Sequence, residues 1–199
     1  DRNFKKEYFF DTVLDIGKYH ESQYALPYEV VPTLMFVNKT LLEQEGIEVP
    51  NENWTWSTME QIVDQITKDK NGDGVIDQFG TYNYTWKEAV YSNGAELFDK
   101  DGKKAFFSGT KVNEAVKFVK KLNEMNGGRE VTQNDFDSGN VAFMPLAFSE
   151  YRTYKTYPYK IKKYTSFQWD CTSMPAGPGG HNTSEVDALL MTIGNKSKH

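Results

Sequence analysis

Residues 25–47 read ALPYEVVPTLMFVNKTLLEQEGI, and the order of residue types in this stretch indicates an α/β fold. The run Val30–Val37 is apolar and rich in β-branched side chains, which predicts a strand despite Pro32. Asn38 is a residue type that caps helices, and the segment KTLLEQE after it predicts a short helix that ends at Gly46. A strand that leads directly into a helix is the repeating unit of α/β proteins.

The same alternation continues toward the C-terminus. Ser57 and Glu60 have the spacing of a capping box, and the apolar residues after them share one helical face, so we expect a helix there. The remaining expected elements are a strand over 78–84, a helix over 86–93, a turn between two short strands at 99–102, a helix over 112–122, and buried strands over 141–146 and 188–193. Strands separated by helices predict an α/β sandwich.

The composition limits the classes of function. The chain has 199 residues, with 23 Lys+Arg against 28 Asp+Glu and a formal net charge of −5, which argues against a nucleic-acid-binding protein. Cys171 is the one cysteine, so an intrachain disulfide and a Cys-based zinc site are excluded. The chain starts at DRNFKK without a signal peptide and stops at NKSKH, so we expect a piece of a longer protein that carries its targeting sequence elsewhere.

The sequence lacks the motifs of common catalytic and phosphate-binding sites. It contains no P-loop pattern, no G-x-S-x-G and no H-E-x-x-H, and the glycines of AGPGG at 176–180 lack the spacing of a dinucleotide-binding loop. A pair of catalytic carboxylates that is assembled only in space stays open as an alternative, because Asp and Glu are plentiful. The residues therefore give no positive evidence for an enzyme and do not exclude one.

Residues 69–80, DKNGDGVIDQFG, have the oxygen spacing of a calcium loop. The expected ligands are the side chains of Asp69, Asn71, Asp73 and Asp77 and the carbonyl of Val75, with Gly74 at the tight turn. Gly80 stands where an EF-hand has its bidentate Glu, so a bound Ca²⁺ would stabilise the structure and would not make the protein a calcium sensor. The alternative is a polar turn built on Asn-Gly and Asp-Gly pairs, without a metal.

Several segments in one order carry a resemblance to a known family. They are ALPYEVVPTLMFVNKTLLEQEGI at 25–47, NWTWSTMEQI at 53–62, DQFGTYNYTW at 77–86, SNGAELFDKDGK at 92–103, FDSGNVAFM at 136–144, FQWDCTSMPAGPGG at 167–180 and DALLMTIGNKSKH at 187–199. In these segments the chain resembles the extracellular solute-binding proteins of sugar ABC transporters, the family related to maltose-binding protein. No segment has a catalytic spacing, but together they cover nearly the whole chain.

The resemblance implies a periplasmic-binding-protein-like fold of type II, in which two α/β lobes surround a hinge and from which most of the first lobe would be absent. Residues 1–37 would be the tail of the N-terminal lobe and the first hinge crossover, residues 38–186 the C-terminal lobe, and residues 187–199 the return crossover. The resemblance also implies a binding protein and not an enzyme, which captures a sugar or oligosaccharide by lobe closure and delivers it to the ABC permease subunits. The protein would then be an extracellular or periplasmic monomer, anchored as a lipoprotein, without a nucleic-acid partner or an organic cofactor.

In α/β lobes, ligands lie at the carboxyl ends of strands, so we place the candidate sugar site in the loops that follow the expected strands. A sugar ring has an apolar face that stacks on Trp or Tyr, and its hydroxyls need hydrogen-bond donors and acceptors. The loops after the expected strands give the candidates Asn83, Tyr84, Trp86, Ser149, Glu150, Tyr151 and Arg152. The resemblance implies five more, which are Trp169 in its W-D segment, Glu185 and Asp187 before the return strand, and Tyr28 and Glu29 before the first crossover.

These candidates have structural alternatives. Trp86 is the first choice for a stacking platform, and its alternative is a core position at the start of a helix. Glu150 and Arg152 can each bind hydroxyls with two groups, and their alternative is a solvated face. Trp169 is expected in the core, with stacking on ligand as the alternative.

Three classes of function stay open from the residues: a transport receptor, which is the main expectation, a calcium-stabilised structural or adhesion domain, and a carbohydrate-active enzyme domain. Stacking rings together with carboxylates fit a neutral sugar best. Arg152 and the lysines leave an anionic sugar open, and peptides and polyamines are not excluded.

Overall fold

The fold is described from a computed structural model, which describes residues 5–99, 101–150 and 167–198. The chain forms two compact units. The first unit is Asp1–Pro32 with Val186–His199, and the second is Thr33–Glu185. From the sequence, the corresponding boundaries are expected at 37–38 and 186–187.

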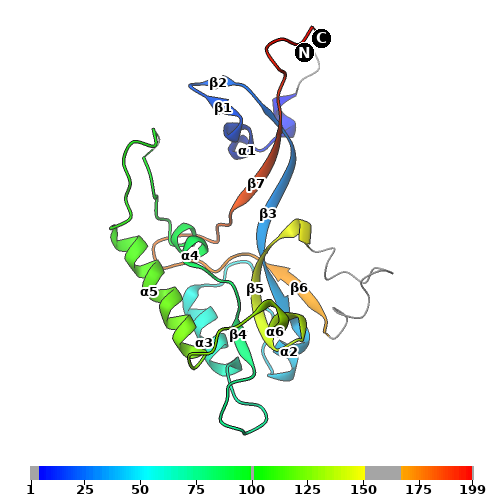
Figure 1. The fold of residues 1–199 in the computed structure, drawn as a ribbon, viewed down its shortest axis with the longest axis vertical. Helices are drawn as coiled ribbons and strands as arrows, with labels where there is room; N and C mark the ends of the chain where they lie inside the picture. Colours follow the sequence, from blue (N-terminus) through cyan, green and yellow to red (C-terminus); the bar gives the residue numbers. More distant parts are fainter. Residues whose placement is uncertain (1–4, 100, 151–166, 199) are drawn as a thin grey trace. The chain divides into compact units, whose positions relative to one another are not determined.

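The first unit is organised around one pair of strands (Figure 1). The first part of β3 (Leu26–Asn38) runs antiparallel to β7 (Val186–Met191), with Pro32 opposite Val186. The other elements of the unit are η1 (Lys6–Tyr8), α1 (Asp11–Ile16), β1 (Lys18–Tyr19) and β2 (Ser22–Gln23). The expectation of a buried strand over 188–193 is wrong, because β7 pairs with β3 along one edge and nearly all of its described side chains face solvent.

The second unit contains a mixed sheet in the order β4-β5-β3-β6. Within this sheet β5 and β6 run antiparallel to the second part of β3, whereas β4 runs parallel to β5. Besides β3, the sheet contains β4 (Phe79–Thr81), β5 (Val141–Ala147) and β6 (Trp169–Thr172). The 3₁₀ turn η2 (Phe148–Glu150) directly follows β5. The strands expected at 30–37 and 141–146 are confirmed by β3 and β5.

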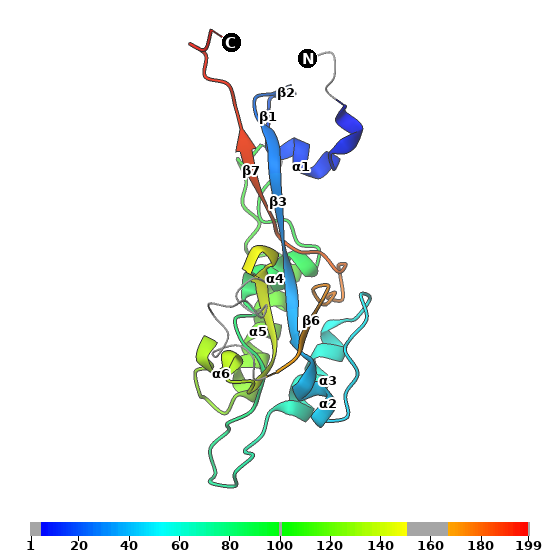
Figure 2. The same ribbon diagram turned by 90° about the vertical axis from the view of Figure 1, so that its right-hand side faces the viewer.

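Helices cover both faces of this sheet, and Figure 2 shows α2 and α3 on one side of it and α6 on the other. Successive side chains of a strand point to opposite faces. Accordingly Met35 and Val37 join the larger apolar cluster with α2 to α5, whereas Phe36 packs in the smaller cluster with Phe136 of α6. The helices are α2 (Lys39–Gln44), α3 (Trp56–Ile66), α4 (Trp86–Ser92), α5 (Thr110–Met125) and α6 (Gln133–Asp137).

Side-chain caps explain where these helices begin. The Asn38 side chain accepts the backbone N–H three residues on at 3.0 Å, as expected for the start of α2. In α3 the cap is Thr55, whose hydroxyl accepts the N–H of Thr58 at 3.3 Å, so the capping box expected from Ser57 and Glu60 is wrong. Thr55 has the extended backbone that an N-cap needs, while Ser57 already lies inside the helix.

Other elements differ from expectation in length. The strand expected over 78–84 is reduced to β4, because Asn83 adopts a left-handed backbone conformation with φ 59° and turns the chain. The two short strands expected around 99–102 are reduced to one bridge between Phe98 and Ala105. Neither β6 nor α6 is anticipated from the sequence, since each is only four or five residues long.

Candidate functional site

The parallel pairing of β4 with β5 defines the edge at which a site can form. Phe79 lies opposite Val141 and Thr81 opposite Phe143, so the carboxyl ends of both strands point to the same edge of the sheet. Polar loop side chains therefore gather at this edge. The segment after β4 brings Tyr82, Asn83 and Trp86 there, and the turn η2 follows β5.

Local conformation directs the side chains that follow β4. Asn is among the residue types that tolerate the left-handed conformation observed at Asn83. Two residues on, Thr85 starts α4 with a capping box, in which its backbone N–H donates to the Glu88 carboxylate at 2.9 Å. Trp86 is thereby fixed in the first turn of α4, and 45% of its surface is exposed. Its ring is accessible for stacking, as the first choice of platform requires.

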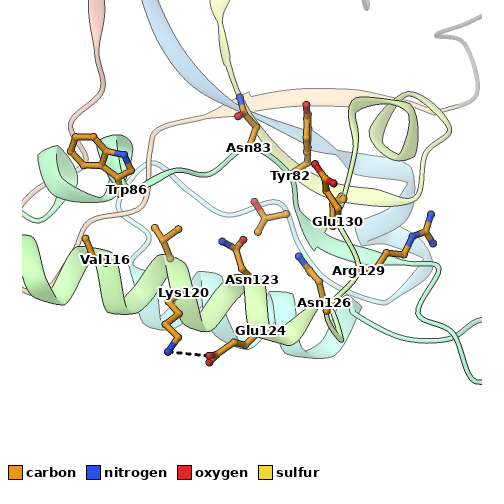
Figure 3. A pocket seen from close by; sticks show the side chains of 14 residues that line it. Tyr82, Asn83, Trp86, Val116, Lys120, Asn123, Glu124, Asn126, Arg129 and Glu130 are labelled. Carbon is orange, nitrogen blue, oxygen red and sulfur yellow. Dashed lines mark ion pairs between the residues drawn. The ribbon is translucent and has the colours of Figure 1, made fainter.

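The loop after β4 faces α5 across a pocket of about 750 Å³ (Figure 3). This volume is in the usual range of small-molecule pockets. The lining residues are Thr81, Tyr82, Asn83, Trp86, Val116, Val119, Lys120, Asn123, Glu124, Asn126, Gly128, Arg129, Glu130 and Val131. Most of the polar groups in this wall are uncharged carboxamides and hydroxyls, which match a ligand that offers hydroxyl groups.

The charged side chains of the pocket wall are largely engaged with other protein groups. Lys120 Nζ lies 3.5 Å from Glu124 Oε1, and Figure 3 shows both side chains pointing away from the pocket. Arg129 donates to Asp135 Oδ1 at 2.9 Å and to the Ile76 carbonyl at 3.0 Å. Both cations of the pocket wall are therefore already paired.

Two of the sequence candidates, Asn83 and Trp86, line this pocket, whereas Tyr84 lies in the core. The Tyr84 hydroxyl accepts the Trp56 indole N–H at 3.0 Å and lies 3.3 Å from Ser92 Oγ. Burial raises the pKa of Tyr84 to about 12. The strand expected over 78–84 ends before Tyr84, because the chain turns at Asn83. The Tyr84 side chain therefore lies in the core.

Trp169 and Glu185 also have partners within the second unit. The Trp169 ring stacks on Phe36, with 5.2 Å between centroids and 24° between planes, which is the core packing expected for it. Glu185 pairs with Lys87 of α4 at 2.6 Å, and the hydrogen bond to Glu185 raises the pKa of Lys87. Glu185 thus stands beside the helix that carries Trp86.

The other candidates are distributed over the chain. Ser149 and Glu150 are exposed in η2, at the carboxyl end of β5. Tyr28 and Glu29 are exposed on β3 and Asp187 on β7, in the first unit. The candidates Tyr151 and Arg152 lie outside the described residues.

The acidic loop is organised by the carboxylate of Asp69. This group accepts the backbone N–H of Asn71 at 3.1 Å, of Gly72 at 2.7 Å and of Gly74 at 2.6 Å. These bonds, the one from Gly74 above all, lower the pKa of Asp69. The loop is therefore organised around one carboxylate, and the bond from Asn71, two residues on, has the geometry of an Asx turn.

The other expected calcium ligands also accept backbone hydrogen bonds. Asn71 accepts from the N–H of Asp73 at 2.9 Å, Asp73 from that of Val75 at 2.8 Å, and Asp77 from that of Lys70 at 2.8 Å. Among residues 5–99, 101–150 and 167–198, no group of three or more His, Cys, Asp or Glu is arranged to hold a metal ion. Calcium binding by this loop stays a prediction.

Sequence reasoning missed the pocket residues contributed by α5 and the segment after it. Val116, Lys120, Asn123 and Asn126 are spaced three or four residues apart and so share one face of the helix. That spacing is readable from the sequence. The sequence cannot show that this face of α5 lies across the pocket from Asn83, because the fold of the sheet brings the two together.

The family model described as bacterial extracellular solute-binding protein matches residues 2–199. Because the match covers nearly the whole chain, the chain belongs to this family. The comparison with curated proteins found no match. None of the helices in the described residues is both long and apolar enough to cross a membrane.

Solved structures with the same fold are about twice as long as this chain. An ABC substrate-binding protein from Listeria monocytogenes, in complex with cycloalternan, has a TM-score of 0.76 at 18% identity, covering 99% of this chain and 50% of its own. A solute-binding protein from Thermotoga lettingae with bound α-D-tagatose has a TM-score of 0.72 at 18% identity, with 99% and 52% covered. The α/β fold of the type II periplasmic-binding-protein-like class is thereby confirmed, and the chain spans about half of these relatives.

A third structure, described as CpMnBP1 with mannobiose bound, has a TM-score of 0.69 at 22% identity and covers 100% of this chain and 52% of its own. At such identities the likeness concerns the fold. The relatives are binding proteins, in agreement with the expectation of a binding protein.

Proposed function

We propose that this chain is part of the substrate-binding component of an ABC importer, which captures a sugar or oligosaccharide and delivers it to the permease. The observation that carries the proposal is the pocket beside β4, where an exposed Trp86 stands next to the carboxamides of Asn83 and Asn123. An indole ring stacks on the apolar face of a sugar, and carboxamides both donate to and accept from its hydroxyls.

The family match and the ligands of the structural relatives support this proposal. Cycloalternan, mannobiose and α-D-tagatose are named in the descriptions of those relatives, and D-mannitol is named in another. All four are uncharged and rich in hydroxyls. A ligand of the same chemical class fits the pocket of this chain, whose wall offers mainly uncharged polar groups.

The remaining parts of the proposal follow from the family. The protein acts outside the cytoplasmic membrane, held there as a lipoprotein in its longer form, and a ligand-induced closure of two lobes presents the loaded shape to the permease subunits. A calcium-stabilised structural domain and a carbohydrate-active enzyme are the alternatives, and the pocket gives neither of them specific support.

Titration of the ¹⁵N-labelled 199-residue chain, followed by NMR, tests this function. The panel contains D-mannitol, mannobiose and maltose, with glycine and leucine as unrelated solutes. We expect the sugars or the polyol to shift the amide signals of Asn83 and Trp86. If about half of the contacts are missing, a loss of even 4 kcal/mol weakens Kd roughly a thousandfold, so weak binding is expected.

Trp86→Ala should abolish these shifts, and Tyr91→Ala is the matched control. Both side chains belong to α4 and both are partly exposed, at 45% and 39%, but Tyr91 does not line the pocket. Shifts caused by the amino acids, or no shift with any sugar, would overturn the proposed function.

A further inference from the structure

Two buried polar oxygens at the pocket have no hydrogen-bond partner among the residues that the structure describes. They are Thr81 Oγ1 and Asn126 Oδ1, in residues that are 4% and 5% exposed. Leaving a buried donor or acceptor unsatisfied destabilises the folded protein. Native interiors therefore rarely keep such groups, and each one needs an explanation.

Both residues line the same pocket, although they come from different elements. Thr81 ends β4, and Asn126 directly follows α5 as its C-cap. Figure 3 shows Asn123 and Asn126 projecting from α5 into the space on the side of β4. The third oxygen of this kind, Gln78 Oε1, differs from them because its side chain does not line the pocket and is anchored through its nitrogen to the Ile66 carbonyl at 2.8 Å.

Each side chain can change the position of its oxygen by rotating about one bond. Turning the Thr81 side chain about χ1 moves its hydroxyl to another staggered position, and turning the Asn126 carboxamide about χ2 exchanges its oxygen and nitrogen. A ligand hydroxyl can accept a hydrogen bond from the Thr81 hydroxyl, and a ligand hydroxyl can donate one to the Asn126 oxygen. An ionised carboxylate or a fully ionised phosphate in contact with the Asn126 oxygen has no proton to donate and leaves that oxygen unsatisfied.

The charges of the wall point to the same ligand class. Its two cations, Lys120 and Arg129, are already paired with Glu124 and Asp135. The remaining acid of the wall, Glu130, would repel an anion. The wall is therefore suited to an uncharged ligand.

We propose that Thr81 and Asn126 form a polar floor that binds hydroxyls of a neutral polyhydroxylated ligand and makes the pocket select against phosphorylated and acidic sugars. The inference rests on the proposed function, because the ligand is the same sugar or polyol. Beyond the proposed function, the inference names the residues that determine specificity and states that the pocket accepts an uncharged ligand.

The test compares Thr81→Val, which removes the hydroxyl and keeps the shape, with Thr81→Ser, which keeps the hydroxyl. In NMR titrations with mannobiose and D-mannitol, we expect Thr81→Val to weaken binding about tenfold and Thr81→Ser to change it little. Asn126→Leu should weaken binding to a similar extent. Mannose 6-phosphate should bind the unmodified chain more weakly than mannose does.

Thermal unfolding without ligand provides a second readout. Thr81→Val should keep or raise Tm, because it removes an unsatisfied hydroxyl. Thr67→Val is the matched control, since the Thr67 hydroxyl accepts the Gly80 N–H at 3.2 Å and does not line the pocket. This control should lower Tm and leave ligand affinity unchanged.

The outcomes separate the two proposals. No response of the unmodified chain to any sugar or polyol overturns the proposed function. Normal binding by Thr81→Val, or mannose 6-phosphate binding at least as tightly as mannose, overturns the polar floor and leaves the proposed function standing. A fall in Tm for Thr81→Val as large as that for Thr67→Val overturns the floor independently of any ligand, since it shows that the hydroxyl is already partnered.

Discussion

Tyr84→Phe distinguishes a core role of Tyr84 from the ligand-binding role that its position in the sequence suggests. The substitution removes the hydroxyl that accepts the Trp56 indole N–H at 3.0 Å and that contacts Ser92 Oγ at 3.3 Å. Ser92 keeps the Ala89 carbonyl as a partner, whereas the buried Trp56 N–H is left without one. Such a loss costs about 1–3 kcal/mol, and we expect about 2 kcal/mol of unfolding free energy.

For a chain of this size, about 2 kcal/mol corresponds to a fall in Tm of about 4–8 °C. Thermal unfolding followed by circular dichroism measures this shift, and urea unfolding gives the free energy. Tyr91→Phe is the matched control, because Tyr91 is exposed on α4 and its replacement should leave Tm within about 1 °C. An unchanged Tm for Tyr84→Phe, combined with weaker sugar binding, would refute the core assignment and return Tyr84 to the pocket.

Further outcomes follow from the same structure. The pKa of Tyr84 is raised to about 12 from an ordinary 10.0, so its contribution to stability is complete below pH 10 and is lost as pH rises through 12. The fall in Tm between pH 9 and pH 11 should therefore be smaller in Tyr84→Phe than in the unmodified chain. If the acidic loop binds calcium, CaCl₂ should raise Tm relative to EDTA in the unmodified chain and not in Asp69→Ala, and an equal response of both would remove the loop as the site. Because the Lys87–Glu185 ion pair is partly exposed, Glu185→Gln should change the unfolding free energy by no more than about 1 kcal/mol; a larger loss of sugar affinity than of stability would mark Glu185 as a ligand contact.

The sequence determined the larger elements because their signals are local. The apolar run at 30–37, the Asn38 cap and the glycine after α5 each act on the adjacent backbone, and β3, α2 and α5 form where these signals place them. Local reasoning was wrong where two caps competed, since Thr55 rather than Ser57 starts α3. It also failed for β7, because exposure depends on what covers a strand and not on its own apolar residues.

For the site, the sequence determined the residue types and the edge of the sheet where they would be found. It placed Asn83 and Trp86 after a strand, and both line the pocket. Only the tertiary structure decided that Tyr84 turns into the core and that the carboxamide face of α5 forms the opposite wall. These outcomes depend on contacts between separate segments of the chain, such as the one between Trp56 and Tyr84, and no periodicity or spacing in the sequence encodes which surfaces such segments present to one another.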